Sequence, residues 1–419
     1  IDGGGNFGVM ETGGDNVINL TALTLTNGYT SGTGGGLLVG SGATLTANAC
    51  TFTGNSAVND FGGGIYADSA TVVLNGCAVT GNFASTGGGG IYENAAPAGS
   101  VILNNCTISG NSAPSGEGGG IYNDAMLSLN NCSIFANVAV GGGSGGGIMN
   151  LDILTASNCT LSANSADGGY GGGIVNGNQM TLNNCTICGN SADDGFGGGL
   201  FTLSATNILV NCTICGNSAV AGGYGGGIYN VGSVLALTNT IVATNTTDNG
   251  GDIYGPYSGL ANFIGGNPKL AGLANYGGGI LTMAPEFGSP VIDAGTDWAT
   301  NVLNTDQRGD PRLSGSHVDI GAVEAQFAPA NNRPVLQNAA YFAGSNSISF
   351  QFSFTNAANA DFTVLTATNL ALPPAQWMIL GNMLEGSPGK FQFVQLIEAQ
   401  HQGQPAVSNP QQFFRVVSP

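Results

Sequence analysis

Residues 100–123 read SVILNNCTISGNSAPSGEGGGIYN, and this stretch decides the fold of the chain. It contains two short apolar or β-branched runs, 101–103 and 106–108, which Asn, Gly and Ser separate. Such runs are too short for helices, and no 3.6-residue periodicity accompanies them. The stretch therefore predicts about three short strands joined by tight turns.

The same pattern recurs with a period of 26–30 residues. A Gly triplet precedes an aliphatic residue at Leu37, Ile65, Ile91, Ile121, Ile148, Ile174, Leu200 and Ile228. Asn keeps the period at Asn55, Asn82, Asn111, Asn137, Asn164, Asn190, Asn217 and Asn245. Cys keeps it at Cys50, Cys77, Cys106, Cys132, Cys159, Cys185 and Cys212, with Thr240 in the next place. This repetition predicts an all-β chain that forms a right-handed parallel β-helix of about ten coils of about 27 residues.

Each periodic residue type has a physical role in such a stack. The Gly triplet allows a sharp turn or a close backbone approach, and the aliphatic residue after it points into the core. Asn at a fixed turn position tolerates the left-handed backbone conformation, and stacked Asn amides can hydrogen-bond from coil to coil. The Cys column is expected to be buried and chemically inert.

The charge distribution excludes several classes of protein. The 419 residues carry 24 acidic and 6 basic side chains, for a net charge of −18, and residues 1–268 contain no Lys, Arg or His. A nucleic-acid partner is therefore excluded, because binding needs cations to neutralise phosphates. A polysaccharide lyase is disfavoured on the repeats, since it needs a basic residue to abstract a proton. No apolar run is long enough for a transmembrane helix.

The repeat resembles that of the polymorphic outer membrane proteins. The resemblance rests on Gly-Gly-Gly-Ile at 118–121 and Ile-x-x-Asn at 108–111, although Gly stands where that family usually has Ala. It covers about residues 30–250, and it implies a surface-exposed, often adhesive, right-handed β-helix.

A second resemblance begins where the repeat degenerates. The segment 262–324 is similar to the terminal segment of bacterial choice-of-anchor Q domain proteins, which are secreted or surface-bound β-helix proteins. The matching residues are Gly288, Ser289, Pro290, Asp293, Asp306, Arg308, Gly309, Arg312, Asp319, Gly321 and Glu324. We therefore expect the β-helix, with its degenerate terminal coils, to span residues 1–324.

The remaining chain has a different pattern. Residues 325–334 (AQFAPANNRP) are typical of a linker, and residues 335–419 are expected to form a separate module. Aromatic and β-branched residues alternate there, as in SISFQFSF at 347–354, and Pro and Gly separate the runs. The alternation predicts a small antiparallel β-sandwich.

Acidic residues supply the candidate catalytic and metal sites. Asp193 and Asp194, with Asp167 one repeat earlier, are the best pair for a glycoside hydrolase, which needs two carboxylates about 5–9.5 Å apart. Soluble turn residues are the favoured interpretation of this group. Asp248 and Asp252 are weak candidates for a Ca²⁺ site, and no other cofactor is expected.

The densest charged cluster lies near the end of the repeats, at Asp306, Arg308, Arg312, Asp319 and Glu324, with Asp310 among them. A metal or catalytic centre is one interpretation. We favour an ion-paired cap that closes the last coil, because Arg–carboxylate pairs suit that task.

Two further groups depend on the stacking. Cys188 and Cys215 are expected to lie outside, one coil apart, within the range of a disulfide. Tyr66, Tyr92, Tyr122 and Tyr229 form an aromatic stripe for which packing is favoured over ligand binding.

These observations predict a secreted, extracellular or cell-surface structural protein rather than an enzyme. The first coil of the stack exposes strand edges, so we expect head-to-tail assembly with copies of itself into a filament, or use as an adhesive rod. A carbohydrate-active enzyme, as a glycoside hydrolase rather than a lyase, and a polysaccharide-binding module are the alternatives.

Overall fold

The computed structural model describes residues 1–94, 99–298, 303–326, 337–343, 347–355, 361–367, 378–387, 390–398 and 413–417. Most of the predicted linker at 325–334 lies outside these residues. The described part is all-β and divides into two compact units. The first unit comprises Ile1–Asn267 with Ile320–Ala322, and the second comprises Pro268–Asp319 with Val323–Pro419.

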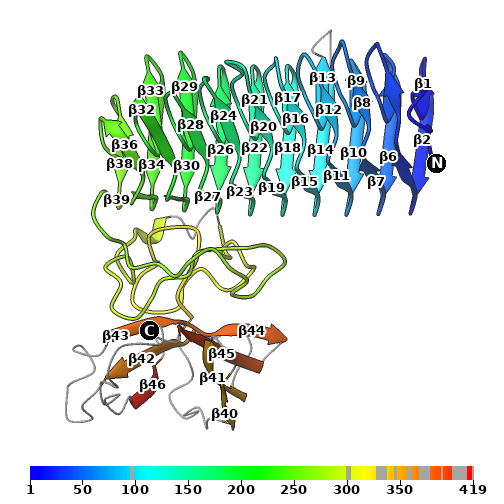
Figure 1. Cartoon of the computed structure of the whole chain (residues 1–419). Helices are drawn as coiled ribbons and strands as arrows, with labels where there is room; N and C mark the ends of the chain where they lie inside the picture. The colour runs from blue at the N-terminus through cyan, green and yellow to red at the C-terminus, as the bar shows by residue number, and fades with distance from the viewer. Residues whose placement is uncertain are drawn as a thin grey trace, which may run out of the picture. The chain divides into compact units, whose positions relative to one another are not determined.

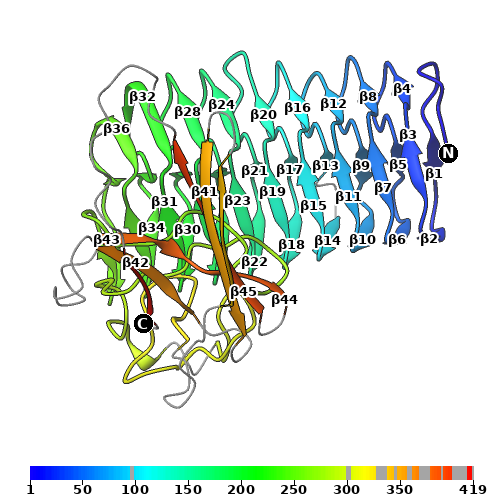
Figure 2. The ribbon, with the colours of Figure 1, turned by 60° about the horizontal axis from the view of Figure 1, so that its bottom comes forward.

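The first unit is a right-handed parallel β-helix, as the period predicts (Figure 1). Nine complete coils of four strands are followed by a tenth coil of three strands, and equivalent strands stack into four parallel sheets. Figure 2 shows the strands of successive coils side by side along the stack.

Sheet 1 contains β1 (Met10–Thr12), β5 (Leu37–Val39), β9 (Ile65–Asp68), β13 (Ile91–Asn94), β17 (Ile121–Asn123), β21 (Ile148–Asn150), β25 (Ile174–Asn176), β29 (Leu200–Leu203), β33 (Ile228–Val231) and β37 (Ile253–Tyr254). Sheet 2 contains β2 (Val17–Thr21), β6 (Thr44–Asn48), β10 (Thr71–Asn75), β14 (Ser100–Asn104), β18 (Met126–Asn130), β22 (Ile153–Ser157), β26 (Gln179–Asn183), β30 (Thr206–Val210), β34 (Val234–Thr238) and β38 (Ser258–Leu260).

Sheet 3 contains β3 (Thr24–Thr26), β7 (Thr51–Thr53), β11 (Ala78–Thr80), β15 (Thr107–Ser109), β19 (Ser133–Phe135), β23 (Thr160–Ser162), β27 (Thr186–Cys188), β31 (Thr213–Cys215), β35 (Ile241–Ala243) and β39 (Phe263–Ile264). Sheet 4 contains β4 (Tyr29–Thr30), β8 (Ser56–Ala57), β12 (Phe83–Ala84), β16 (Ser112–Ala113), β20 (Val138–Ala139), β24 (Ser165–Asp167), β28 (Ser191–Asp193), β32 (Ser218–Tyr224) and β36 (Thr246–Asn249).

The core follows from the repeat register. Ile121 pairs with Ile148 and Ile91 in the adjacent coils, and the whole aliphatic column after the Gly triplets is fully buried. Leu, Val and Ile from sheets 2 and 3 fill the rest of the interior. Because each buried side chain packs on its own equivalent one coil away, the periodic sequence is enough to specify the core.

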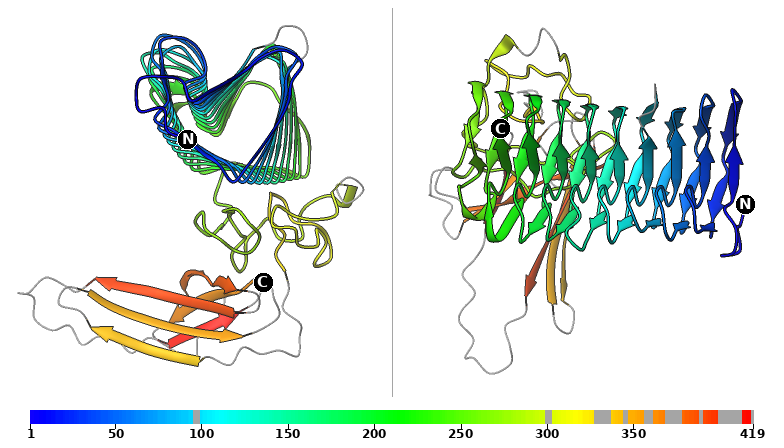
Figure 3. Two further views of the ribbon diagram at one scale, coloured as in Figure 1. Left: turned by 90° about the vertical axis from the view of Figure 1, so that its right-hand side faces the viewer. Right: turned by 90° about the horizontal axis from the view of Figure 1, so that it is seen from above.

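The Gly triplets let the chain fold inward between sheets 4 and 1, where the outline seen along the stack is indented (Figure 3). The first Gly of a triplet has a positive φ, as at Gly145 (68°). A Cβ on the second, Gly146, would lie 2.3 Å from the Ser165 carbonyl oxygen. The turn therefore requires Gly for both its backbone conformation and its close contact with the next coil.

The left-handed backbone expected at the first Asn column occurs at other positions. It falls on the residue before that column, for example Gly110 (φ 63°) and Ala136 (φ 53°). It also falls on the Asn column that precedes the Cys residues, for example Asn105 (φ 54°) and Asn131 (φ 52°). The first Asn column instead turns its side chains into the interior, where their hydrogen bonds define the position.

The second unit contains the predicted small antiparallel sandwich. One sheet has the order β40 (Gln337–Ala343), β41 (Ser347–Thr355), β45 (Lys390–Glu398), β44 (Leu384–Ser387), and the other has the order β43 (Met378–Asn382), β42 (Thr363–Ala367), β46 (Phe413–Val417). Phe352, Phe354, Phe362, Val364 and Phe393 form its core.

The two units do not follow the boundary after residue 324 that the repeats suggest. Residues 268–319 belong to the second unit and contain antiparallel bridges, such as Ala274–Thr282, in place of coil strands. The short segment Ile320–Ala322 returns to the first unit, where Gly321 N donates to Asn239 O (2.8 Å). In the described residues no helix is long and apolar enough to cross a membrane.

Candidate functional site

The predicted Asn ladder, from Asn55 to Asn245, runs through the interior of the stack. Each amide nitrogen donates to the amide oxygen of the next coil, as from Asn111 to Asn137 (2.9 Å) and from Asn137 to Asn164 (2.9 Å). That nitrogen also donates to a carbonyl of the preceding coil, as from Asn137 to Ile108 O (2.9 Å). This first Asn ladder therefore ties each coil to both of its neighbours.

The ladder ends on a carboxylate. Asp252 Oδ1 accepts hydrogen bonds from Asn245 N (2.7 Å) and Asn245 Nδ2 (2.8 Å). Asp248 Oδ2 accepts from Gly222 N (2.7 Å). The two carboxylates proposed for Ca²⁺ are thus engaged by separate protein donors, and no group of three potential metal ligands occurs in the described residues.

A second Asn ladder was missed in the sequence. Asn123 Nδ2 donates to Asn150 Oδ1 (2.6 Å), Asn150 Nδ2 to Asn176 Oδ1 (2.6 Å), and Asn176 Nδ2 to Asn207 Oδ1 (2.8 Å). All four residues are fully buried. The recurrence of Asn two residues after the aliphatic residue of the Gly triplet was a visible signal for three of them.

The Cys column forms a third interior line. The Sγ of one coil accepts a hydrogen bond from the backbone of the preceding coil, as from Cys50 N to Cys77 Sγ (3.3 Å), and Thr240 Oγ1 takes this place for Cys212 N (3.4 Å). Burial raises the pKa of the Cys159 and Cys212 thiols. A deeply buried thiol with a raised pKa is a poor nucleophile, which agrees with a packing role for Cys159 and Cys212.

The disulfide expected between Cys188 and Cys215 is not formed in the structure. The two residues pair in register across β27 and β31, as the period predicts, but both are free thiols. Cys215 is only 1% exposed, and burial raises its pKa to about 12. It shares its face of β31 with Thr213, whose Oγ1 accepts a hydrogen bond from Ala322 N (3.0 Å). The segment Ile320–Ala322 therefore returns to a face of sheet 3 that the repeat alone predicts to be open.

Two of the candidate hydrolase carboxylates end strands of sheet 4, and the third directly follows one of them. Asp167 and Asp193 pair in register across β24 and β28, and Asp194 follows with φ 58°. All three side chains are exposed, and Asp193 Oδ1 accepts from Ser191 Oγ (2.6 Å). This geometry agrees with the preferred interpretation of soluble turn residues.

The aromatic stripe on sheet 1 is a set of stacked rings. Tyr92 stacks on Tyr66 (centroids 5.4 Å, planes 4° apart) and on Tyr122 (4.6 Å, 13°). Tyr229 stacks on Phe201 (5.4 Å, 6°) and on Tyr254 (4.9 Å, 5°). These ring faces cover one another, so they are not available as sugar platforms, which favours the packing role.

The charged cluster near the end of the repeats forms a buried ion network in the second unit. The Arg308 guanidinium contacts Asp306 Oδ2 (2.9 Å) and Asp361 Oδ1 (3.0 Å), and it donates to the Glu324 carbonyl (2.5 Å). Asp361 was missed because it lies 53 residues away in the sequence. The network joins the turns at 303–326 to the residues that lead into β42.

The other members of the cluster bind the same turns. Arg312 Nη2 donates to Asp319 O (3.0 Å), and Glu324 accepts from Ser314 N (3.0 Å) and Asp319 N (2.8 Å). Burial raises the pKa of Glu324 to about 8 and that of Asp319 to about 6. The residues proposed to cap the last coil are thus brought together inside the second unit, where they cross-link its irregular segment.

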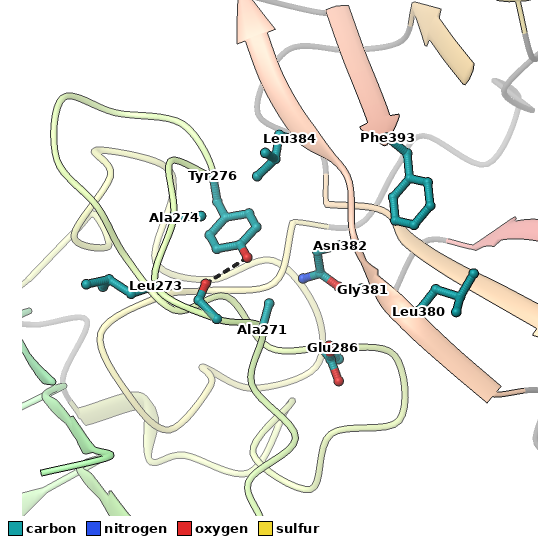
Figure 4. Close-up of a pocket in the computed structure, with 11 residues that line it drawn as sticks. Ala271, Leu273, Ala274, Tyr276, Glu286, Leu380, Gly381, Asn382, Leu384 and Phe393 are labelled. Atoms are coloured by element: carbon teal, nitrogen blue, oxygen red, sulfur yellow. Dashed lines mark hydrogen bonds between the residues drawn. The ribbon is translucent and has the colours of Figure 1, made fainter. Parts of the chain in front are cut away.

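A cavity of about 530 Å³ also lies in the second unit (Figure 4). Leu273, Leu380, Leu384 and Phe393 supply apolar walls. Tyr276 Oη donates to Gly272 O (2.8 Å), and Asn382 Nδ2 donates to Pro285 O (3.3 Å). Glu286 contributes a carboxylate whose pKa is raised by burial and lowered in part by Lys269. Polar and apolar groups contribute equally to the lining, so the cavity could hold a small amphipathic molecule that carries a hydrogen-bond donor.

Comparison of the chain with protein-family models, with curated proteins and with solved structures found no match. The two family resemblances seen in the sequence therefore stay predictions, and the parallel β-helix is what the structure adds to them.

Proposed function

We propose that the protein is an extracellular structural rod whose coils associate with a second copy of the chain, head to tail. The observation that carries the proposal is the open edge of the tenth coil. In the described residues, β37, β38 and β39 each pair with a strand on one side only. In the sequence this edge does not fall at a terminus. It lies just before Pro268, where the coils end and the second unit begins.

The chemistry of the tenth coil supports association. All three residues of β38 are exposed, and Tyr254, Tyr257 and Leu260 present large apolar side chains. Native edge strands are commonly protected by Lys or by inward-facing charges. No Lys or Arg occurs in residues 1–268, so this edge carries no protecting Lys.

The proposed occupant is the β1 and β2 edge of the first coil of another copy, since equivalent strands already pair in parallel at every step of the stack. The β3 edge of that coil is already bonded by residues 1–3 of its own chain. The exposed apolar residues Phe7 and Val17 belong to that coil. A contact between two different surfaces repeats without closing and therefore makes a filament. The continuous interior ladders support a mechanical role, because they tie every coil to its neighbours.

Light scattering and electron microscopy over a range of protein concentrations test this proposal. We expect assemblies that grow with concentration, and we expect the double variant S258D/L260D to weaken them by placing like charges on the edge strand. Val234→Asp is the matched control, since Val234 is exposed on β34, which is paired on both sides. Monomers at every concentration, or equal loss of assembly in the control, would show that this edge does not mediate association.

A further inference from the structure

Both Asn ladders have the same polarity. Each amide nitrogen donates to the oxygen of the next coil toward the C-terminus, so each amide oxygen accepts from the coil before it. The first ladder can end on the Asp252 carboxylate because that end needs only an acceptor. The N-terminal end of a ladder, by contrast, needs a donor.

Glu93 occupies that donor position in the second ladder. It pairs in register with Asn123 across β13 and β17, and both residues are 0% exposed. Among the residues that the structure describes, neither carboxyl oxygen of Glu93 has a hydrogen-bond partner, and Asn123 Oδ1 has none either. An ionised Glu93 would place only acceptors at this end of the ladder, and unsatisfied buried acceptors are costly.

The surroundings of Glu93 offer no compensating charge. Toward β9 its register partner is Ala67, with Asp68 one residue beyond, and toward β17 the residue after Asn123 is Asp124. Residues 1–268 contain no Lys, Arg or His. The packing is close, since a Cβ on Gly99 would lie 2.6 Å from Glu93 Oε1.

We propose that the Glu93 carboxyl group is protonated in the folded stack at neutral pH and donates a hydrogen bond to Asn123 Oδ1. This bond makes Glu93 the first member of the second ladder. The added proton turns two facing acceptors into a donor and an acceptor. The protonation of this buried residue thereby makes the stability of the coils around β13 and β17 fall as the pH rises.

Electrostatics agree with this assignment. Burial, and then repulsion from Asp124 and Asp152, raises the pKa of Glu93 from 4.5 to about 8. Since the folded state keeps a proton that the unfolded state loses above 4.5, the stabilisation is complete below that pH. It is lost as the pH rises through about 8. Over this range the folding equilibrium constant should fall about tenfold per pH unit from this residue alone.

The decisive variant is Glu93→Gln, whose amide can donate to Asn123 Oδ1 at any pH. Hydrogen exchange of the peptides that contain β13 and β17 is compared between pH 5 and pH 9. We expect protection to fall with rising pH in the native chain, beyond the intrinsic rate change, and to stay constant in the variant. Glu11→Gln is the control, because Glu11 is exposed on β1 of the same sheet.

Infrared spectroscopy gives a second measurement, which reports the protonation of the carboxyl group directly. A protonated carboxyl band should persist at pH 7 and disappear with an apparent pKa near 8. Glu324 is expected to contribute a similar band, and Asp319 and Asp361 also have raised pKa values, so the Glu93 signal is the band that Glu93→Gln removes in an E324Q background. Absence of the band at pH 7 in that background, or the same pH profile in Glu93→Gln as in the native chain, would overturn the proposal.

Discussion

Replacing Asn137 with Ala tests whether the first Asn ladder stabilises the stack. Asn137 Nδ2 donates to Ile108 O (2.9 Å) and to Asn164 Oδ1 (2.9 Å). Its Oδ1 accepts from Asn111 N (3.1 Å) and from Asn111 Nδ2 (2.9 Å). The residue is fully buried, so water cannot replace these four bonds.

The expected cost follows from what the substitution leaves behind. Asn111 Nδ2 keeps its bond to Val79 O, and Asn164 Oδ1 keeps its bond from Asn137 N. Asn111 N and Ile108 O, however, lose the partners that Asn137 supplies. Asn111 N is then a buried donor without a partner, which at about 1–3 kcal/mol predicts a loss of about 1–3 kcal/mol in the free energy of unfolding.

Asn130→Ala is the matched control, since Asn130 Nδ2 donates to Asn104 Oδ1 (3.1 Å) in an exposed ladder on β18. Because water can replace that bond, its loss should cost at most about 1 kcal/mol. Urea unfolding is followed by far-UV circular dichroism, because the two tryptophans, Trp298 and Trp377, lie outside residues 1–267. Equal costs for the two variants would refute the stabilising role of the buried ladder.

Two further variants test the other structural devices of the chain. Gly146→Ala should destabilise the coils by about 1–3 kcal/mol or more, because the new Cβ would meet backbone oxygens at 2.3 and 2.6 Å. Gly13→Ala is the control in the same urea assay and should be nearly neutral, because a Cβ there would have no atom within 4 Å. Arg308→Met should cost the second unit about 3–5 kcal/mol by leaving the Asp306 and Asp361 carboxylates buried without their cation. Thermal unfolding followed by tryptophan fluorescence measures this loss, and an unchanged midpoint would show that the network does not stabilise the unit.

The repeat made much of the first unit predictable. Residues that are 26–30 apart in the sequence are neighbours in adjacent coils. The tertiary contacts of a periodic column such as Asn55 to Asn245 can therefore be predicted from its spacing. The same logic identified the buried Cys column and the register of Cys188 with Cys215. The second Asn ladder was equally periodic at Asn123, Asn150 and Asn176 and could have been found in this way.

Contacts without a period were not predictable. Asp361 joins Arg308 across 53 residues, and Ala322 reaches Thr213 across 109, so no local pattern relates them. The charged cluster at 306–324 was recognised as one group, but its place in the second unit depends on how the chain leaves the stack after Asn267.

The sequence by itself determined the parallel β-helix, its period and its inward-facing columns, because each coil repeats the contacts of the last. Only the tertiary structure decided where those columns begin and end. Asp252 ends the first ladder as an acceptor, whereas Glu93 stands at the donor end of the second, where its carboxyl oxygens have no hydrogen-bond partner in the described part of the chain. The physical reason is that a hydrogen-bonded ladder has a direction, and the direction appears only when donors and acceptors are placed in space.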